Sequence, residues 1–227
     1  MKSIWHGVLL SFSYFSILPI RLKNRAMNRK VYASLLWIFP FVGFSIAFLS
    51  VLLFMVLKDF MPLGYGAIVC ACVYLCLYGF LHLEALCDVI DGYFASLSGK
   101  NIYEIMKDPH VGAVGAIGTF VFVLMKVAVI TYLLLESKEE IFLTAVIFSR
   151  LGLIFGLFAF SFHAKSTFAL QLKSSASVQL VLLSFIAYGI LSYFVLDFKS
   201  VLLFALISIA TISWVLYILK KKFGFLN

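Results

Sequence analysis

Half of the acidic residues of this chain are concentrated in one short polar stretch. The sequence has ten Asp and Glu residues, and five of them lie between positions 84 and 108: Glu84, Asp88, Asp91, Glu104 and Asp108. The first three are spaced i, i+4 and i+7, so a helix here would carry their carboxylates on one stripe. Like charges at this spacing cost a helix roughly a few tenths of a kcal/mol per pair, so the stripe is unfavourable unless a cation compensates it.

These carboxylates indicate a hard metal ion. Ligands that offer only oxygen suit Mg²⁺, which in proteins usually bridges a few carboxylates and a substrate phosphate. A solvated helix face is the alternative explanation, but only 12% of the residues are charged, which weakens it. We therefore expect Mg²⁺ as cofactor, held on the stripe of Glu84, Asp88 and Asp91. The sequence leaves open which of them acts as a base.

The residues around this stretch favour a phosphate-bearing substrate. Gly112 and Gly115 allow close backbone approach, and a helix that starts there presents free N–H groups to an anion. Small-residue helix packing explains the two glycines equally well. His82 and Lys107 flank the carboxylates, and we expect both to contact substrate, although an interfacial histidine is the alternative for His82.

Two cations lie inside apolar segments. Lys126 and Arg150 each sit in a run long enough to cross a membrane. Cations at such positions are costly and usually face a partner or a polar cavity. We expect them to bind substrate phosphate or to pair with the carboxylates, with snorkelling to the membrane surface as the alternative.

The elements that carry these residues are expected to be transmembrane helices. Of the residues, 64% are hydrophobic, whereas a soluble domain has roughly 45–50%. Uninterrupted apolar runs without alternation select helices over a barrel. We expect an all-α, polytopic transmembrane helix bundle, one domain over residues 1–227, with six to seven membrane segments: 5–20, 31–57, 63–81, 111–135, 141–162, 178–196 and 201–219. The first of these either crosses the membrane or is re-entrant or interfacial.

Loop charge predicts the orientation of the bundle. Twelve basic residues fall on one side, in the loops near 21–30, 100–107, 165–173 and 220–222, against three on the other side: Lys58, Lys138 and Lys199. The positive-inside rule places the richer side, and with it the segment 82–110, in the cytoplasm. The net charge of +8 is therefore explained by topology, and no nucleic acid is expected as partner.

Several motifs resemble one enzyme family. Residues 82–92 read HLEALCDVIDG, residues 104–115 read EIMKDPHVGAVG, and the elements FPFVG (39–43), LP (18–19) and SR (149–150) accompany them. In this order they are similar to the motifs of the cobalamin synthase family, the adenosylcobinamide-GDP ribazoletransferases. The two acidic blocks at this spacing form the most specific part of the resemblance.

The resemblance implies an activity, substrates and a location. Members of that family join adenosylcobinamide-GDP to α-ribazole or its 5′-phosphate, give adenosylcobalamin or its phosphate, and release GMP. They require Mg²⁺ and are multi-pass proteins of the bacterial inner (plasma) membrane. The resemblance thus implies a transferase of cobalamin biosynthesis. It also implies that four carboxylates are the catalytic residues and the ligands of the metal and the diphosphate: Glu84, Asp88, Asp91 and Asp108.

The sequence also departs from the family pattern. Glu84 and Ala85 stand where the signature has Asp and Gly, and Pro109-His110 replaces a Ser-Arg pair. Family members continue past the last basic cluster with a Gly-Gly-x-Thr-Gly-Asp-like segment and a further helix, whereas this sequence ends at Asn227. If that segment contributes to the site, we expect the shortened C-terminus to impair activity.

Two other functions compete with this interpretation. A CDP-alcohol phosphotransferase-like enzyme also uses clustered aspartates and Mg²⁺, but its Asp-Gly-x-x-Ala-Arg start is not found here. An ion-coupled transporter would use Lys126 or Arg150, yet transporter sites favour the membrane midplane and repeated halves. The acids of this chain cluster near one membrane face, which makes the transporter the weakest of the three.

Overall fold

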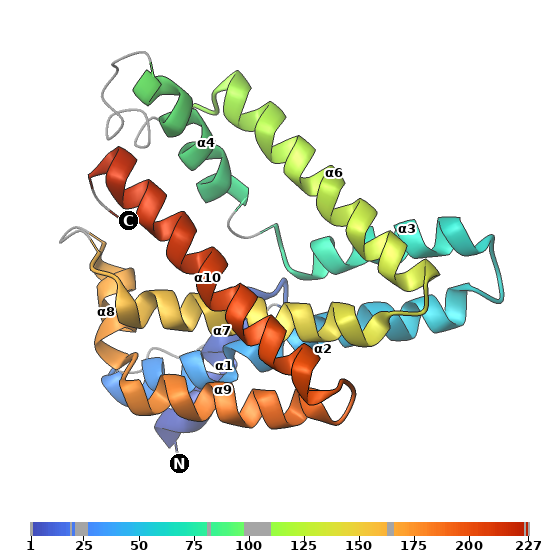
Figure 1. The fold of residues 1–227 in the computed structure, drawn as a ribbon, viewed down its shortest axis with the longest axis horizontal. Helices are drawn as coiled ribbons and strands as arrows, with labels where there is room; N and C mark the ends of the chain where they lie inside the picture. Colours follow the sequence, from blue (N-terminus) through green and yellow to red (C-terminus); the bar gives the residue numbers. More distant parts are fainter. Residues whose placement is uncertain are drawn as a thin grey trace.

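The computed structural model describes residues 2–18, 20, 27–80, 83–97, 110–162, 166–224 and 226. All regular secondary structure in these ranges is helical, which confirms the predicted all-α class (Figure 1). In chain order the helices are α1 (Lys2–Phe15), α2 (Arg29–Leu57), α3 (Leu63–Leu77), α4 (Leu83–Leu97), α6 (Ala113–Leu135), α7 (Glu139–Ala159), α8 (Thr167–Ser175), α9 (Val178–Tyr193) and α10 (Phe198–Phe223).

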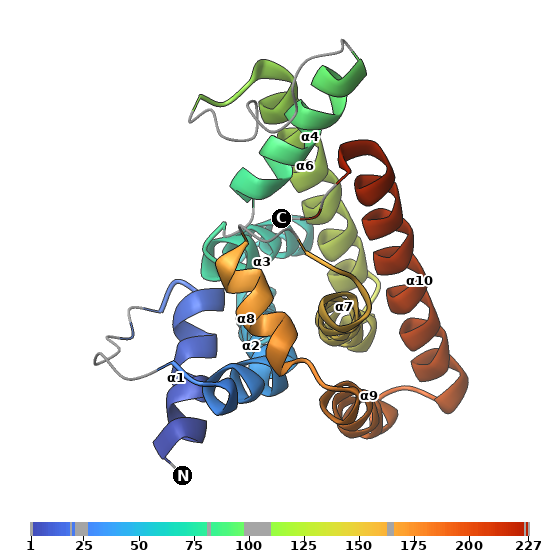
Figure 2. The same cartoon turned by 90° about the vertical axis from the view of Figure 1, so that its left-hand side faces the viewer.

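The bundle is organised around α2 and α7. Helix α2 packs against α1, α3, α7 and α8, and α7 also packs against α9 and α10. Figure 2 shows α7 near the middle, with α1 and α10 on opposite sides of it. Leu35 and Val42 of α2 and Leu151 and Ile154 of α7 are completely buried. These two helices therefore form most of the protein interior.

Hydrogen bonds from a few polar side chains fix the packing of α2. The Ser50 hydroxyl donates to the Cys70 carbonyl of α3 at 2.7 Å, and the Tyr188 hydroxyl of α9 donates to the Trp37 carbonyl at 2.8 Å. Tyr32 donates to Gln171 of α8 at 2.6 Å. In an apolar surrounding such bonds satisfy groups that would otherwise be costly to bury.

Helix ends follow local sequence signals. Asn28 caps α2 by accepting from the Val31 N–H, and Asp197 caps α10 by accepting from the Lys199 and Ser200 N–H groups. At its other end, α10 stops at Gly224, which has φ 76°, a left-handed conformation that suits glycine. The three lysines of its last turn favourably face the negative end of the helix dipole.

Fewer helices are of spanning length than the six to seven expected. Four helices of the described residues are long and apolar enough to cross a membrane, or five if the bent pair α8 and α9 forms one span. Helix α1 has only 14 residues and α3 only 15, and about 20 residues are needed for a full crossing. The prediction overcounted because apolar composition continues beyond the ends of these two helices.

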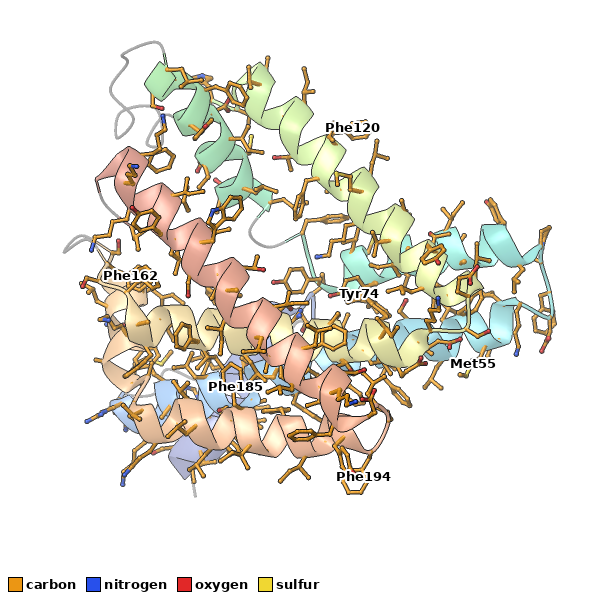
Figure 3. All side chains as sticks on the ribbon, in the orientation of Figure 1. Met55, Tyr74, Phe120, Phe162, Phe185 and Phe194 are labelled. Carbon is orange, nitrogen blue, oxygen red and sulfur yellow. The ribbon has the colours of Figure 1, made fainter. Side chains whose placement is uncertain are left out.

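Lipid is the natural neighbour of the outer helices. In α10 none of the most apolar window is buried, and in α6 only 11% of it is buried. Their exposed side chains are large and apolar, among them Phe120, Met125, Leu206 and Trp214. Figure 3 shows Phe120 on the outer side of α6. This surface fits hydrocarbon, as the composition predicted.

A tight turn leads from α3 into the acidic helix. Gly79 and Phe80 both have positive φ, 77° and 50°. The segment after α1 packs against this turn, since the Ile17 N–H donates to the Leu77 carbonyl at 3.0 Å. The turn ends α3 four residues short of the predicted boundary at residue 81 and redirects the chain so that α4 and α6 lie side by side (Figure 1).

Candidate active site

The three acids of the stripe lie on one helix, as their spacing predicts. Helix α4 runs from Leu83 to Leu97 and carries Glu84, Asp88 and Asp91. Its buried residues are Cys87 and Gly92, and α4 packs mainly on α6. Glu84 is exposed, whereas Asp88 and Asp91 are partly buried. The stripe therefore passes from solvent toward the contact between α4 and α6.

Asp91 binds the start of α6. One carboxylate oxygen accepts from the Gly112 N–H at 2.9 Å, and the other accepts from the Gly115 N–H at 2.7 Å. Gly112 is the N-cap residue of α6, so the carboxylate also faces the positive end of the helix dipole. One side chain thus holds the acidic helix to the glycine-rich helix start.

The two glycines are required for this contact. A Cβ atom on Gly112 would lie 2.5 Å from Cγ of Asp91, and one on Gly115 would lie 2.6 Å from Cγ of Asp91 and 2.7 Å from the Cys87 carbonyl oxygen. Real Cβ atoms do not approach other atoms so closely. The N–H groups that we expected to seat a diphosphate are therefore used by Asp91, and the glycines give the carboxylate room to reach them.

The carboxylates of α4 are close enough to one another to affect the pKa of Asp88. Burial raises the pKa of Asp88, and the nearby carboxylates of Glu84 and Asp91 raise it further. A raised pKa means that the charged form is less favourable here than in water, and a nearby cation would offset this cost. This repulsion gives a physical reason for a cation at the stripe, and the metal itself stays a prediction.

Oxygen-only donors of this kind fit Mg²⁺. Within the described ranges no group of three His, Cys, Asp or Glu side chains is placed to hold a metal ion. Mg²⁺ commonly binds one or two carboxylates and completes its shell with water and substrate phosphate. Within the stripe, Glu84 and Asp88 are the carboxylates that form no hydrogen bond with the start of α6, in contrast to Asp91. Asp108, Lys107 and His82 lie outside the described residues, so their predicted roles stay predictions.

The two intramembrane cations meet in one cavity. Lys126 of α6 and Arg150 of α7 both line a cavity of about 410 Å³ between α3, α6 and α7. The Tyr78 ring lies between them, 5.5 Å from Nζ of Lys126 and 5.1 Å from Cζ of Arg150. Figure 3 shows Tyr74, another lining residue, in the space between α3 and α7. Neither cation forms an ion pair with a carboxylate of the described residues. The fold therefore brings the two cations to one cavity but does not pair them with the carboxylates of α4.

Arg150 is held by its own helix and by a glycine of α2. It is only 5% exposed, and its guanidinium donates to the Val146 carbonyl at 3.0 Å. Its Nε is buried without a hydrogen-bond partner. A Cβ on Gly43 would lie 2.6 Å from Cδ of Arg150, so the glycine of the FPFVG element leaves space for this side chain.

Sequence reasoning missed three contacts. It did not pair Asp91 with Gly112 and Gly115, nor Gly43 with Arg150, although the motifs contain all five residues. It also did not place the end of α10 beside α4, where Nζ of Lys222 lies 5.5 Å from the Tyr93 ring centre. A charged side chain and small residues in separate motifs were the available signals for the first two contacts.

Comparison with known proteins points to one family. Residues 7–227 match the family model described as Cobalamin-5-phosphate synthase. An adenosylcobinamide-GDP ribazoletransferase of Clostridium botulinum (strain Okra) is 28% identical over 155 residues, 68% of this chain and 62% of the relative. The enzyme of that name from Acetivibrio thermocellus is 27% identical over 96% of this chain and 88% of its own length. That of Treponema denticola is 32% identical over 71% and 60%.

Two further facts qualify these comparisons. The chain spans about 62% of the length of the first curated relatives that it matches. No solved structure matches it. The likeness to these enzymes therefore comes from sequence.

Proposed function

Because the chain belongs to the cobalamin-5-phosphate synthase family, we propose that it is an adenosylcobinamide-GDP ribazoletransferase. It joins adenosylcobinamide-GDP to α-ribazole or its 5′-phosphate and releases GMP. An acceptor hydroxyl oxygen forms a bond to the phosphorus that carries the cobinamide. The bond from that phosphorus to the bridging oxygen breaks, GMP leaves with the bridging oxygen, and the hydroxyl proton passes to a carboxylate or to water.

The observation that carries this proposal is the junction of α4 and α6. The two motif blocks of the family contribute Asp91 on one side and Gly112 and Gly115 on the other, and the two hydrogen bonds join them. The junction orients Glu84 and Asp88 on the adjacent turns of α4. Positioning and charge neutralisation are the main demands of phosphoryl transfer.

In this proposal each residue of the site has its own role. Asp91 fixes the orientation of the stripe through its hydrogen bonds to Gly112 and Gly115. Glu84 and Asp88 would hold Mg²⁺. One of the four predicted carboxylates (Glu84, Asp88, Asp91 or Asp108) accepts the proton of the acceptor hydroxyl. Mg²⁺, when bound, neutralises charge on the diphosphate. The lysines at the end of α10, which lie beside α4, add positive potential near the leaving phosphate.

We also propose the location of this site. The protein resides in the bacterial inner (plasma) membrane with α4 on the cytoplasmic side, because twelve loop cations accompany that side and three the other. The end of α10 with its three lysines lies beside α4, which agrees with this orientation. Water-soluble substrates would then reach the carboxylates from the cytoplasm.

A direct assay tests the proposed activity. Membranes that contain the protein are supplied with adenosylcobinamide-GDP, α-ribazole 5′-phosphate and Mg²⁺, and the release of GMP is measured. We expect Asp88→Asn to abolish the release, because it removes a metal ligand. Asp59→Asn, which changes an exposed carboxylate in the α2–α3 connection, serves as the matched control and should release GMP normally. No GMP from well-expressed wild-type protein would refute the activity.

A further inference from the structure

The cavity between α3, α6 and α7 has the composition of an anion site. It holds about 410 Å³ and is lined by two cations, two tyrosines and otherwise mostly apolar side chains. This size and this mixture of apolar walls with few polar groups are typical of small-molecule sites. Lys126 and Arg150 lie near the middle of their helices, so both cations are in the apolar layer of the bundle.

Neither cation has its charge balanced by a residue that the structure describes, although Arg150 donates to the Val146 carbonyl. No carboxylate of the described residues pairs with either of them, and Nε of the buried Arg150 has no partner. The rings of Tyr74 and Tyr78 lie 5.6 and 5.5 Å from Nζ of Lys126, but cation–π contacts offset only part of the cost of burying a charge. An anion in the cavity would neutralise both cations at once.

This cavity is a close neighbour of the carboxylate stripe along the chain. Tyr78 stands between the two cations, and Glu84 follows six residues later. Six residues span at most about 22 Å even when fully extended. A ligand in the cavity can therefore belong to the same reaction as a ligand on the stripe.

On the basis of the proposed function, we infer that the cavity lined by Lys126, Arg150, Tyr74 and Tyr78 binds the phosphomonoester and the flat base of the acceptor nucleotide. The diphosphate of the other substrate would be neutralised by Mg²⁺ held on the carboxylates. The acceptor phosphate takes no part in the reaction and needs separate cations, because a carboxylate stripe repels it. The tyrosine rings offer faces on which a planar base can stack.

Acceptor selectivity provides the kinetic test. The ratio of kcat/KM for α-ribazole 5′-phosphate to that for α-ribazole is measured in wild type, Lys126→Met and Lys138→Met. We expect Lys126→Met to lower this ratio by about tenfold or more, which is the usual effect of removing a charge-assisted contact. Lys138→Met is the matched control, because Lys138 is an exposed cation that lies 4.0 Å from Glu136, and it should keep the ratio. Arg150→Lys retains the charge and should lose less than Lys126→Met.

Binding without turnover separates this inference from the proposed function. The Kd of α-ribazole 5′-phosphate is measured on purified protein in neutral-lipid nanodiscs, with neither the other substrate nor Mg²⁺ present. An increase of about tenfold or more in Lys126→Met, with no change in Lys138→Met, supports the cavity even if no GMP is formed. An unchanged Kd in Lys126→Met overturns it, even if wild type is active.

The same variants exclude other ligands of the cavity. If Lys126→Met raises KM for adenosylcobinamide-GDP and not for the acceptor phosphate, the cavity serves the other substrate and the inference is wrong. A lipid headgroup is the other possible ligand, and nanodiscs with anionic phosphatidylglycerol test it. The cavity binds lipid headgroups instead if two results occur together. The lipid competes with the acceptor phosphate in Lys138→Met but not in Lys126→Met, and the two variants bind the acceptor equally well in neutral lipid.

Discussion

The carboxylate of Asp91 accepts from both Gly112 and Gly115, so a single side chain holds the acidic helix to the start of α6. A carboxylate at a helix N-terminus is favourable because of the free N–H groups and the dipole. The contact depends on the absence of side chains at both glycines. We therefore expect activity and local packing to be coupled at these three residues.

Gly115→Ala should show this coupling. The new Cβ would meet the Asp91 carboxylate and the Cys87 carbonyl, which must shift α4 relative to α6. We expect a loss of about 1–3 kcal/mol in stability from overpacking and a fall of about 100-fold in GMP release from misplaced carboxylates. Gly64→Ala is the control, because a Cβ there meets nothing within 4 Å. Equal activity of both variants would show that the junction does not position the site.

Asp88→Asn should stabilise the metal-free protein while it removes activity. Burial and the carboxylates of Glu84 and Asp91 raise the pKa of Asp88, so its charged form is unfavourable in the folded state. Because Asp88 is partly exposed, we expect a gain of only about a few tenths of a kcal/mol, or roughly 1 °C in Tm. Thermal unfolding in EDTA measures it. A lower Tm for Asp88→Asn than for wild type would contradict the proposed repulsion.

At the scale of the helices, α7 is the element on which the other parts depend. It carries Arg150 toward the cavity, and its glycines allow α10 to approach: a Cβ on Gly152 would lie 3.0 Å from the Ser208 carbonyl oxygen. Its C-terminal carbonyls are satisfied from another helix, because Nζ of Lys173 in α8 donates to Leu157, Phe158 and Phe160. The last carbonyls of a helix have no partner within the helix, and Lys173 supplies donors for three carbonyls at this end.

Lys173→Met should therefore weaken the end of α7. It removes the cation from the negative end of the helix dipole and leaves carbonyls without donors, which we expect to cost about 1–2 kcal/mol of unfolding free energy. Lys199→Met, at an exposed position near the start of α10, should cost nothing measurable. The midpoints of thermal unfolding of the two variants in detergent are compared. Equal midpoints would show that the Lys173 contacts contribute little.

Sequence reasoning succeeded where one pattern determines one element. The i, i+4, i+7 acids predicted α4, and Gly112 predicted the start of α6. It was less successful at the ends of α1 and α3, because apolar residues such as Ile17 and Leu18 continue past Phe15 and only the turn geometry stops the helix. The pairing of Asp91 with the glycines joins two motifs about twenty positions apart, and spacing along the chain does not contain that contact.

At the scale of the whole molecule, exposed apolar side chains indicate which surface faces lipid, and charged side chains indicate which end of the bundle faces the cytoplasm. Exposed apolar residues of α6 and α10 mark the surface that faces lipid. Loop cations mark one membrane side, and the helix ends agree with them: α4 and the lysines that end α10 lie next to each other. The proposed topology puts Asp59, in the short α2–α3 connection, on the side opposite α4, and it therefore requires the 15-residue helix α3 to cross the membrane.

Labelling of intact cells tests this orientation. In a background without the four native cysteines, Asp59→Cys, Phe94→Cys and Lys221→Cys are introduced one at a time, each at an exposed position. A membrane-impermeant maleimide should label Asp59→Cys from outside and should label the other two only after permeabilisation. The cations of the C-terminal lysines and of the remaining cytoplasmic loops resist translocation, which is the physical reason for this result. The reverse pattern would place the carboxylates outside the cytoplasm, away from a supply of nucleotide-activated substrate, and would contradict the proposed function together with the topology.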